Sequence, residues 1–186
     1  MPVNSGELKD VTTTGAVSLI TFASTAAQLV LLNGMLMGTS ASTRIGRRIT
    51  VKSIYLRYWA SLATGTTGTS PIRIMIVLDK QANTQAPAAG DILLADNISQ
   101  PNNLSNSRRF VTLCDKVLDG IGTVGKASEH FEFYKKTNLE VQYNTGNAGT
   151  VADIQSGSLY LLVWSTGAFG TTSPTGGYTV RLRFTD

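Results

Sequence analysis

The chain has one cysteine and one histidine, and this scarcity limits the chemistry that it can perform. A single cysteine cannot form an internal disulfide, which excludes the disulfide-framed scaffold of small extracellular domains. One cysteine and one histidine cannot supply a tetrahedral zinc site. Asp91, Asp96 and Asn97 carry oxygen ligands but lack the spacing of a calcium loop. We therefore expect no metal and no cofactor.

The cysteine, Cys114, lies in the stretch SRRFVTLCDKVLDG, which reads as a strand. Alternation puts Cys114 on the face of Phe110 and Thr112, opposite Val111, and points Asp115 away from it. A catalytic thiol needs a base that stabilises its thiolate, normally a histidine. The lone His130 lies in another predicted strand and has no third group to orient it, so a Cys/His hydrolase is the weaker interpretation. We predict that the chain is not an enzyme.

Long apolar runs are also missing. The longest, QLVLLNGMLMG, is too short and too interrupted to cross a bilayer, and the N-terminus lacks the pattern of a signal peptide. Charged residues make up only 15% of the chain and hydrophobic residues 42%, with abundant Gly, Thr, Ser and Asn. This composition is typical of a turn-rich β protein, and 1–186 fits one domain. We expect a soluble, non-secreted protein without a membrane partner.

Acidic residues are absent from two long stretches, 11–78 and 154–185, although both stretches carry cations. The cations are Arg44, Arg47, Arg48, Lys52, Arg57 and Arg73 in the first stretch, and Arg181 and Arg183 in the second. Surface potential depends on where charges cluster, so this segregation points to a polyanionic partner.

Period-2 alternation broken by Gly, Thr, Asn and Pro dominates the rest of the sequence, without a sustained helical period. The predicted strands cover 16–22, 48–63, 71–79, 109–119, 128–135, 137–143, 157–165 and 178–184. About eight strands with uneven spacing and long loops favour an all-β fold, a single eight-stranded jelly-roll β-sandwich. The segment GSLYLLVWS is apolar on both faces, which predicts a central strand covered on each side or one at a subunit contact. APAAGDILL is expected to form one helical turn.

The cations near the start of the second predicted strand are the main functional signal. TRIGRRITVK can be a solvated strand entry or a source of salt bridges to a neighbouring subunit, or it can bind nucleic-acid phosphates. In a jelly roll we expect the fourth and last strands to be neighbours in one four-stranded sheet, which places Arg73 beside Arg181 and Arg183. Since neither segment offers an acid to balance such a row, we favour phosphate binding.

Several blocks, in order, resemble a known family of coat proteins. They are LLNGMLMGTSASTRIGRRITVKSIYLRYWASL, IRIMIVLDKQANTQAPAAGDIL, PNNLSNSRRFVTLCDKV and SGSLYLLVWSTG, and they span roughly 6–184. The sequence resembles the capsid proteins of circular Rep-encoding single-stranded DNA viruses (CRESS DNA viruses), particularly those with coats similar to satellite tobacco necrosis virus. RIGRRITVKSIYLR and VLDKQANTQAPAAGDIL are the most specific blocks.

The resemblance implies a jelly roll of the viral capsid type that assembles with itself into the simplest icosahedral shell, T=1 with about 60 copies. Such a shell encloses single-stranded nucleic acid, here DNA, on its inner face, and the chain is expected in the virion. Coats of this type usually begin with a basic arm that enters the shell and often carries a nuclear-import signal. Before Arg44 the only basic residue is Lys9, so we expect the arm and the signal to be absent. The resemblance is compatible with entry of the full-length protein into the host nucleus.

The residues that we predict to face the genome are Arg44, Arg47, Arg48, Lys52, Arg73, Arg181 and Arg183. Trp59, Tyr58, Phe169 and Tyr178 lie where anchors of contacts between subunits would be useful, but ordinary core packing is the stronger interpretation for each one. The alternative from another class is a monomeric jelly-roll module for carbohydrates, which would use exposed aromatics such as Trp59 or Trp164.

Overall fold

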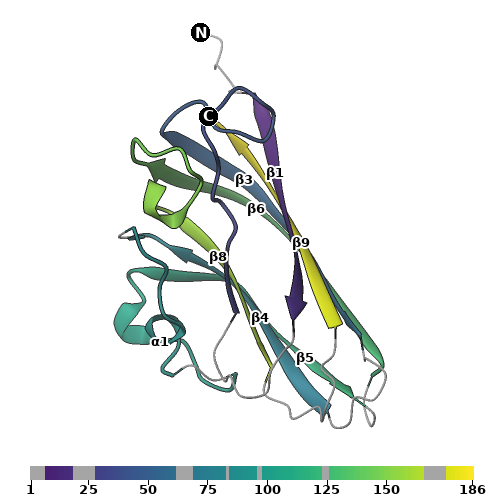
Figure 1. The fold of residues 1–186 in the computed structure, drawn as a ribbon. Helices are drawn as coiled ribbons and strands as arrows, with labels where there is room; N and C mark the ends of the chain where they lie inside the picture. Colours follow the sequence, from purple (N-terminus) through teal and green to yellow (C-terminus); the bar gives the residue numbers. More distant parts are fainter. Residues whose placement is uncertain are drawn as a thin grey trace.

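The strands form two antiparallel sheets that pack face to face (Figure 1). The computed structural model describes residues 7–18, 28–61, 69–82, 84–95, 98–122, 126–165 and 175–186. One sheet has five strands in the order β1-β9-β3-β6-β7, and the other has four in the order β2-β8-β4-β5. The strands are β1 (Leu8–Ser18), β2 (Gln28–Leu31), β3 (Arg48–Ser61), β4 (Thr69–Asp79), β5 (Phe110–Gly122), β6 (Ser128–Tyr143), β7 (Ile154–Ser156), β8 (Ser158–Ser165) and β9 (Thr175–Thr185). This order is that of a jelly roll with the short β7 added at one edge, and the predicted fold class is confirmed.

Most predicted strands coincide with observed ones, and the differences have local causes. The two strands predicted over 128–135 and 137–143 are one strand, β6, because the irregularity between them is a β-bulge opposite Val51 and Ser53. The strand predicted over 16–22 overlaps β1 only at 16–18, and 19–22 lie outside the described residues. β2 and β7 were not predicted, because they are too short to show alternation.

The main core lies between the sheets and is built by alternate residues of facing strands. Ile72, Ile74 and Ile76 of β4 are fully buried there, as the alternation of PIRIMIVLD predicts. Leu182 and Phe184 of β9 meet them from the five-stranded sheet. Period-2 patterning therefore fixes which face of each strand is inward.

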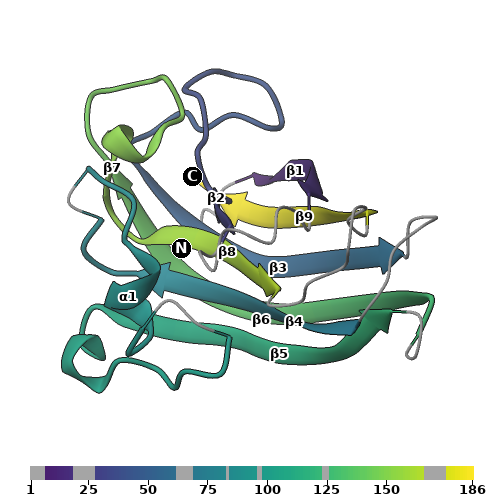
Figure 2. The same cartoon turned by 60° about the horizontal axis from the view of Figure 1, so that its bottom comes forward.

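A second apolar cluster covers the other face of the four-stranded sheet. The connection 80–109, which contains α1 (Ala89–Ile92) and a 3-10 turn (Leu104–Asn106), places Ile92, Leu93 and Ile98 against that face. Figure 2 shows α1 beside β4 and β5, away from β1 and β9. Within β8, Leu161 belongs to the main core and Leu162 to the second cluster, and both are fully buried. The predictions of a central strand covered on each side and of one helical turn are confirmed.

Cys114 lies on the core side of β5, and the predicted faces of this strand need a correction. The register shifts by one residue opposite Ile76 and Val77, where Leu113 is the extra residue. The bulge puts Cys114 in the main core, on the opposite face from Phe110, which packs in the second cluster. Asp115 points away from Cys114, as predicted.

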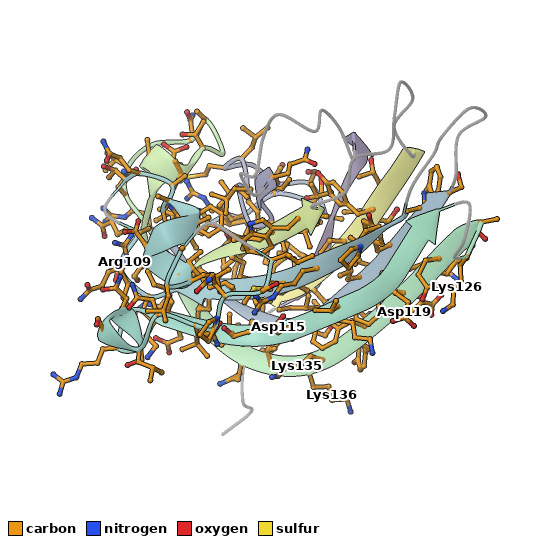
Figure 3. The ribbon with its side chains drawn as sticks, turned by 90° about the horizontal axis from the view of Figure 1, so that it is seen from below. Arg109, Asp115, Asp119, Lys126, Lys135 and Lys136 are labelled. Atoms are coloured by element: carbon orange, nitrogen blue, oxygen red, sulfur yellow. The ribbon has the colours of Figure 1, made fainter. Side chains whose placement is uncertain are left out.

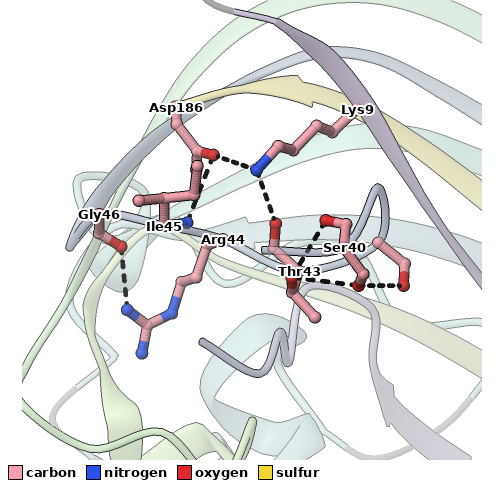
Figure 4. A network of polar contacts seen from close by, with 8 residues as sticks. Lys9, Ser40, Thr43, Arg44, Ile45, Gly46 and Asp186 are labelled. Carbon is pink, nitrogen blue, oxygen red and sulfur yellow. Dashed lines mark hydrogen bonds and ion pairs between the residues drawn. The ribbon is translucent and has the colours of Figure 1, made fainter. Parts of the chain in front are cut away.

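A buried arginine organises the segment 32–47 at the end of the sandwich (Figure 4). Arg44 has no solvent exposure, and its guanidinium donates to the carbonyl oxygens of Met35 (3.3 Å), Gly46 (2.9 Å) and Gly146. The guanidinium carbon also lies 4.1 Å from the centroid of the Tyr143 ring. Buried carbonyls need donors, so this one side chain satisfies the backbone of segments that are far apart in the sequence.

The C-terminal residue is fixed next to this segment. The buried ammonium of Lys9 donates to the Asp186 carboxylate (2.8 Å) and to the Thr43 carbonyl (3.2 Å). The backbone N–H of Ile45 donates to the same carboxylate at 3.3 Å. These contacts tie β1, the end of β9 and the segment 32–47 together.

Arg44→Met should lower the free energy of unfolding by about 3 kcal/mol, because the three carbonyls lose their buried donor and the ring loses its cation. The matched control is Arg47→Ala, which removes an exposed arginine three residues away and should change stability by no more than about 0.5 kcal/mol. Urea unfolding followed by tryptophan fluorescence, at one protein concentration, measures both. Equal effects of the two substitutions would contradict a structural role of Arg44.

Candidate nucleic-acid interface

The five-stranded sheet has one face in the core and one face that stays exposed among the described residues. In β9, Val180 and Leu182 are buried, whereas Arg181 and Arg183 are exposed on the opposite side. We call this second side the open face. It consists of the outward residues of β1, β9, β3 and β6: Asp10, Thr12, Thr14, Thr179, Arg181, Arg183, Arg48, Thr50, Lys52, Tyr55, Arg57, Trp59, His130, Glu132, Tyr134, Lys136, Glu140 and Gln142.

Cations outnumber carboxylates on the open face, and some of the cations are already paired. Arg57 forms an exposed ion pair with Glu132 at 2.7 Å, and the hydrogen bond from Arg57 lowers the pKa of that carboxyl. Arg181 reaches Asp10 only at 3.9 Å, with both side chains more than half exposed. Such surface pairs contribute little and leave the cation available to a stronger anion. Within the described part of the chain, Arg183 forms no ion pair.

Arg47, Arg48 and Lys52 lie where the chain enters β3. Arg47 and Arg48 are exposed, and no ion pair holds either of them among the described residues. Lys52 lies at the bulge of β3 and donates to the side-chain oxygen of Asn138 at 2.8 Å. Arg48 and Lys52 extend the charge of Arg181 and Arg183 along the same sheet, because β3 pairs with β9, and Arg47 directly precedes β3.

Two of the predicted genome-facing residues are buried instead. The nitrogens of the Arg44 guanidinium donate to backbone carbonyls, as described above. Arg73 is 7% exposed and makes a bidentate ion pair with Asp115, with nitrogen–oxygen distances of 2.8 and 2.7 Å. Its remaining nitrogen donates to the carbonyls of Ile98 (2.8 Å) and Gln100 (2.7 Å), so Arg73 holds the connection 80–109 on the sheet. Neither guanidinium has a free edge for a phosphate.

The predicted neighbourhood of Arg73, Arg181 and Arg183 is wrong. β4 pairs with β5 and β8 in the four-stranded sheet, whereas β9 pairs with β1 and β3 in the other sheet. Arg73 therefore points away from the core on the opposite side of the sandwich from Arg181 and Arg183. Its balancing acid is Asp115 of the adjacent strand, which the composition of the acid-free segments could not reveal.

Other residues of the open face were missed because only strand register reveals them. Lys136 pairs with Ser53, which pairs in turn with Arg183, so Lys136 joins the same row of the sheet. Figure 3 shows Lys136 extending away from the ribbon of β6, whereas Lys135 donates to the Leu113 carbonyl of β5 at 3.4 Å and does not belong to the open face. Tyr134 is 58% exposed and pairs with Tyr55, whose other neighbour is Arg181. The period-2 pattern of β6 indicates which of its residues share a face, but only the pairing with β3 shows that this face adjoins the cations of β9.

Cys114 and His130, the candidates for a catalytic pair, lie on different faces of different sheets. Cys114 faces the main core, and burial raises the pKa of its thiol to about 11, which disfavours the reactive thiolate. His130 lies on the open face, opposite Trp59 in the neighbouring strand. The part of the chain that the structure describes contains no group of three His, Cys, Asp or Glu side chains placed to hold a metal ion. None of its helices is long and apolar enough to cross a membrane.

Known proteins that are similar to this chain include a coat protein and two virus structures. Over 151 residues the chain is 26% identical to the coat protein of maize white line mosaic satellite virus. This match covers 80% of this chain and 68% of that protein. Two solved structures of turnip yellow mosaic virus, one of its empty head, are similar with TM-scores of 0.41 and 0.42 and identities of 12% and 11%. Each match covers 100% of this chain and 84% of the virus chain.

A family model described as satellite tobacco necrosis virus coat protein matches residues 8–186, almost the whole chain. Membership in such a family means that the chain is a viral capsid protein and a component of the virion, that it assembles with copies of itself into a shell, and that it is not an enzyme. The coat-protein part of the resemblance is thereby confirmed. The chain belongs to the satellite tobacco necrosis virus coat protein family.

Proposed function

We propose that the chain acts as one shell domain, that about 60 copies form a T=1 icosahedral shell, and that this shell encloses a single-stranded DNA genome. We further propose that the open face lines the interior. The observation that carries this assignment is the asymmetry of the sandwich. The outer face of the four-stranded sheet is covered by the connection 80–109, whereas the open face is exposed and rich in cations.

Exposed apolar side chains outside the open face support contacts between subunits. Leu94 and Leu104 of the connection 80–109 are 61% and 78% exposed. Leu36, Met37 and Ile45 form a second exposed apolar group on the segment 32–47. Burial of such groups against another copy is favourable in proportion to the apolar area removed from water.

Of the four aromatics considered as subunit anchors, two follow the stronger interpretation, which is core packing. Tyr58 and Tyr178 are buried in the main core of their own subunit, and Phe169 lies outside the described residues. Trp59 is 44% exposed but lies on the open face. Trp164 is buried in the second cluster, which removes it as a sugar platform and weakens the carbohydrate-module alternative.

The DNA assignment rests on the blocks RIGRRITVKSIYLR and VLDKQANTQAPAAGDIL, which resemble coats of CRESS DNA viruses. Nucleic acid extracted from purified particles tests it directly. We expect digestion by a single-strand-specific DNase and resistance to RNase. If the nucleic acid is degraded by RNase alone, the genome is RNA and the DNA assignment is wrong, but the shell assignment is unaffected.

Electron microscopy and native mass measurement should show closed particles of about 60 copies of the 19.8 kDa chain, or about 1.2 MDa. The double variant Leu94→Glu/Leu104→Glu puts charge on the exposed apolar side chains of the connection and should reduce assembly while circular dichroism stays that of the folded subunit. A wild-type protein that stays monomeric at all concentrations would contradict the shell and favour the carbohydrate module.

Replacing both Arg181 and Arg183 by Ala should weaken the binding of single-stranded oligonucleotides and reduce its salt dependence. Each lost phosphate contact reduces the slope of log K against log salt by about 0.7, so the double variant should lose about 1.4. The triple variant Arg47→Ala/Arg48→Ala/Lys52→Ala should act in the same direction. Fluorescence anisotropy with unassembled subunits over a salt series measures both.

Arg108→Ala is the matched control, because Arg108 is exposed in the connection that covers the other sheet. It removes one positive charge from the opposite side of the sandwich and should change the slope by much less than the value of about 0.7 expected per charge on the open face. An unchanged salt slope in both the double variant and the triple variant would overturn the interior assignment. An equal loss per charge removed with Arg108→Ala would indicate an effect of net charge rather than of the open face.

A further inference from the structure

The open face carries exposed aromatic rings among its cations. Trp59 is 44% exposed and Tyr134 is 58% exposed, whereas Trp164 is only 2% exposed. A single exposed aromatic needs no explanation, but these two lie on adjacent strands of the same basic face. The rings are therefore available to the same partner as the arginines.

The indole of Trp59 is held in place by a glycine of the neighbouring strand. Trp59 pairs with Gly177 of β9. A Cβ atom at position 177 would lie 2.9 Å from the indole Nε1 and 3.2 Å from Cε2, which is closer than real side chains approach. The ring thus lies over Gly177, and the absence of a side chain there lets the indole rest against the sheet. A ring positioned in this way loses little freedom when it binds a ligand.

Tyr134 lies in a row of the sheet that also carries a cation. In this row Arg181, Tyr55 and Tyr134 are neighbours across β9, β3 and β6. Neighbouring strands are about 4.8 Å apart, so the row places one cation and two rings within about 10 Å. Trp59 lies four residues along β3 from Tyr55, or about 13 Å away. Between these two rows lies the Arg57–Glu132 pair.

This arrangement matches the chemistry of a single strand better than that of a duplex. Unpaired bases offer their flat faces to aromatic rings while their phosphates bind arginine and lysine. In a duplex the bases are stacked on one another, so their flat faces are not available to aromatic side chains. We propose that Trp59 and Tyr134 stack nucleobases of the single strand whose phosphates bind Arg181 and Arg183. This proposal rests on the proposed function, since it deepens the role of the open face.

Indole fluorescence reports the contact directly, because the chain has two tryptophans and Trp164 is buried. Titration of unassembled subunits with oligo(dT) should quench the emission, and the same titration of Trp59→Phe should leave the emission of Trp164 nearly unchanged. An abasic oligonucleotide of the same length, which has the phosphates without the bases, should quench little. Equal quenching by the abasic strand would overturn the proposal.

Affinity measurements test the energetic contribution of each ring. Trp59→Ala and Tyr134→Ala should each weaken oligo(dT) binding by about five- to a hundredfold, with the salt slope unchanged. Tyr134→Phe keeps the ring and should retain most of the affinity. Val117→Ala, which trims another exposed apolar side chain on β5, is the matched control and should have no effect.

The two proposals fail in distinguishable ways. If the arginine variants reduce the salt slope while the wild type binds abasic and oligo(dT) strands equally, the open face binds phosphates only and the stacking proposal is wrong. If neither set of variants changes binding, the proposed function of the open face fails as well. Tighter binding of a duplex than of oligo(dT) would also overturn the stacking proposal.

Discussion

The need to cover both faces of the four-stranded sheet determines how the two sides of this molecule differ. β8 is apolar on both faces, so a single sandwich interface cannot bury it. The connection 80–109 supplies the second cover, because its residues Ile92, Leu93 and Ile98 pack against the outer face of this sheet. The five-stranded sheet alternates apolar and polar residues and needs no such cover. Burial thus leaves one broad face of the sandwich for a partner.

Arginines that look alike in the sequence divide into two roles because of this asymmetry. Arg73 lies beneath the connection, and Arg109 pairs with the fully buried Asp79 at 2.8 Å, so both hold the second cover in place. A guanidinium suits this work because its fixed fork satisfies a carboxylate and backbone carbonyls at once. Arg181 and Arg183, on the uncovered sheet, have no comparable partners among the described residues. Only cations of this second kind can exchange water for phosphate at low cost.

Sequence patterning predicted the local structure well and the long-range pairing poorly. The alternation of β4, β8 and β9 gave the correct inward faces, because burial imposes a period of two wherever a strand is regular. It failed at the bulge in β5, where one extra residue moved Cys114 to the core, since a bulge leaves no period to read. It also failed for Arg73, whose acid is supplied by a strand far away in the sequence. The open face could not be assembled beforehand for the same reason: Lys136 and Arg183 become neighbours only through register.

An exposed sheet face suits the packaging of a strand of any sequence. Every nucleotide has a phosphate and a ring face, so cations and aromatics on an exposed sheet accept any sequence of a strand. Each subunit then needs only weak binding, because copies fixed in one shell act on the same strand and their contributions combine. Weak contacts also let the strand shift while the shell closes, whereas a few tight sites would trap partly assembled forms. If the open face lines the interior, as we propose, its exposed cations and rings can accept a strand of any sequence.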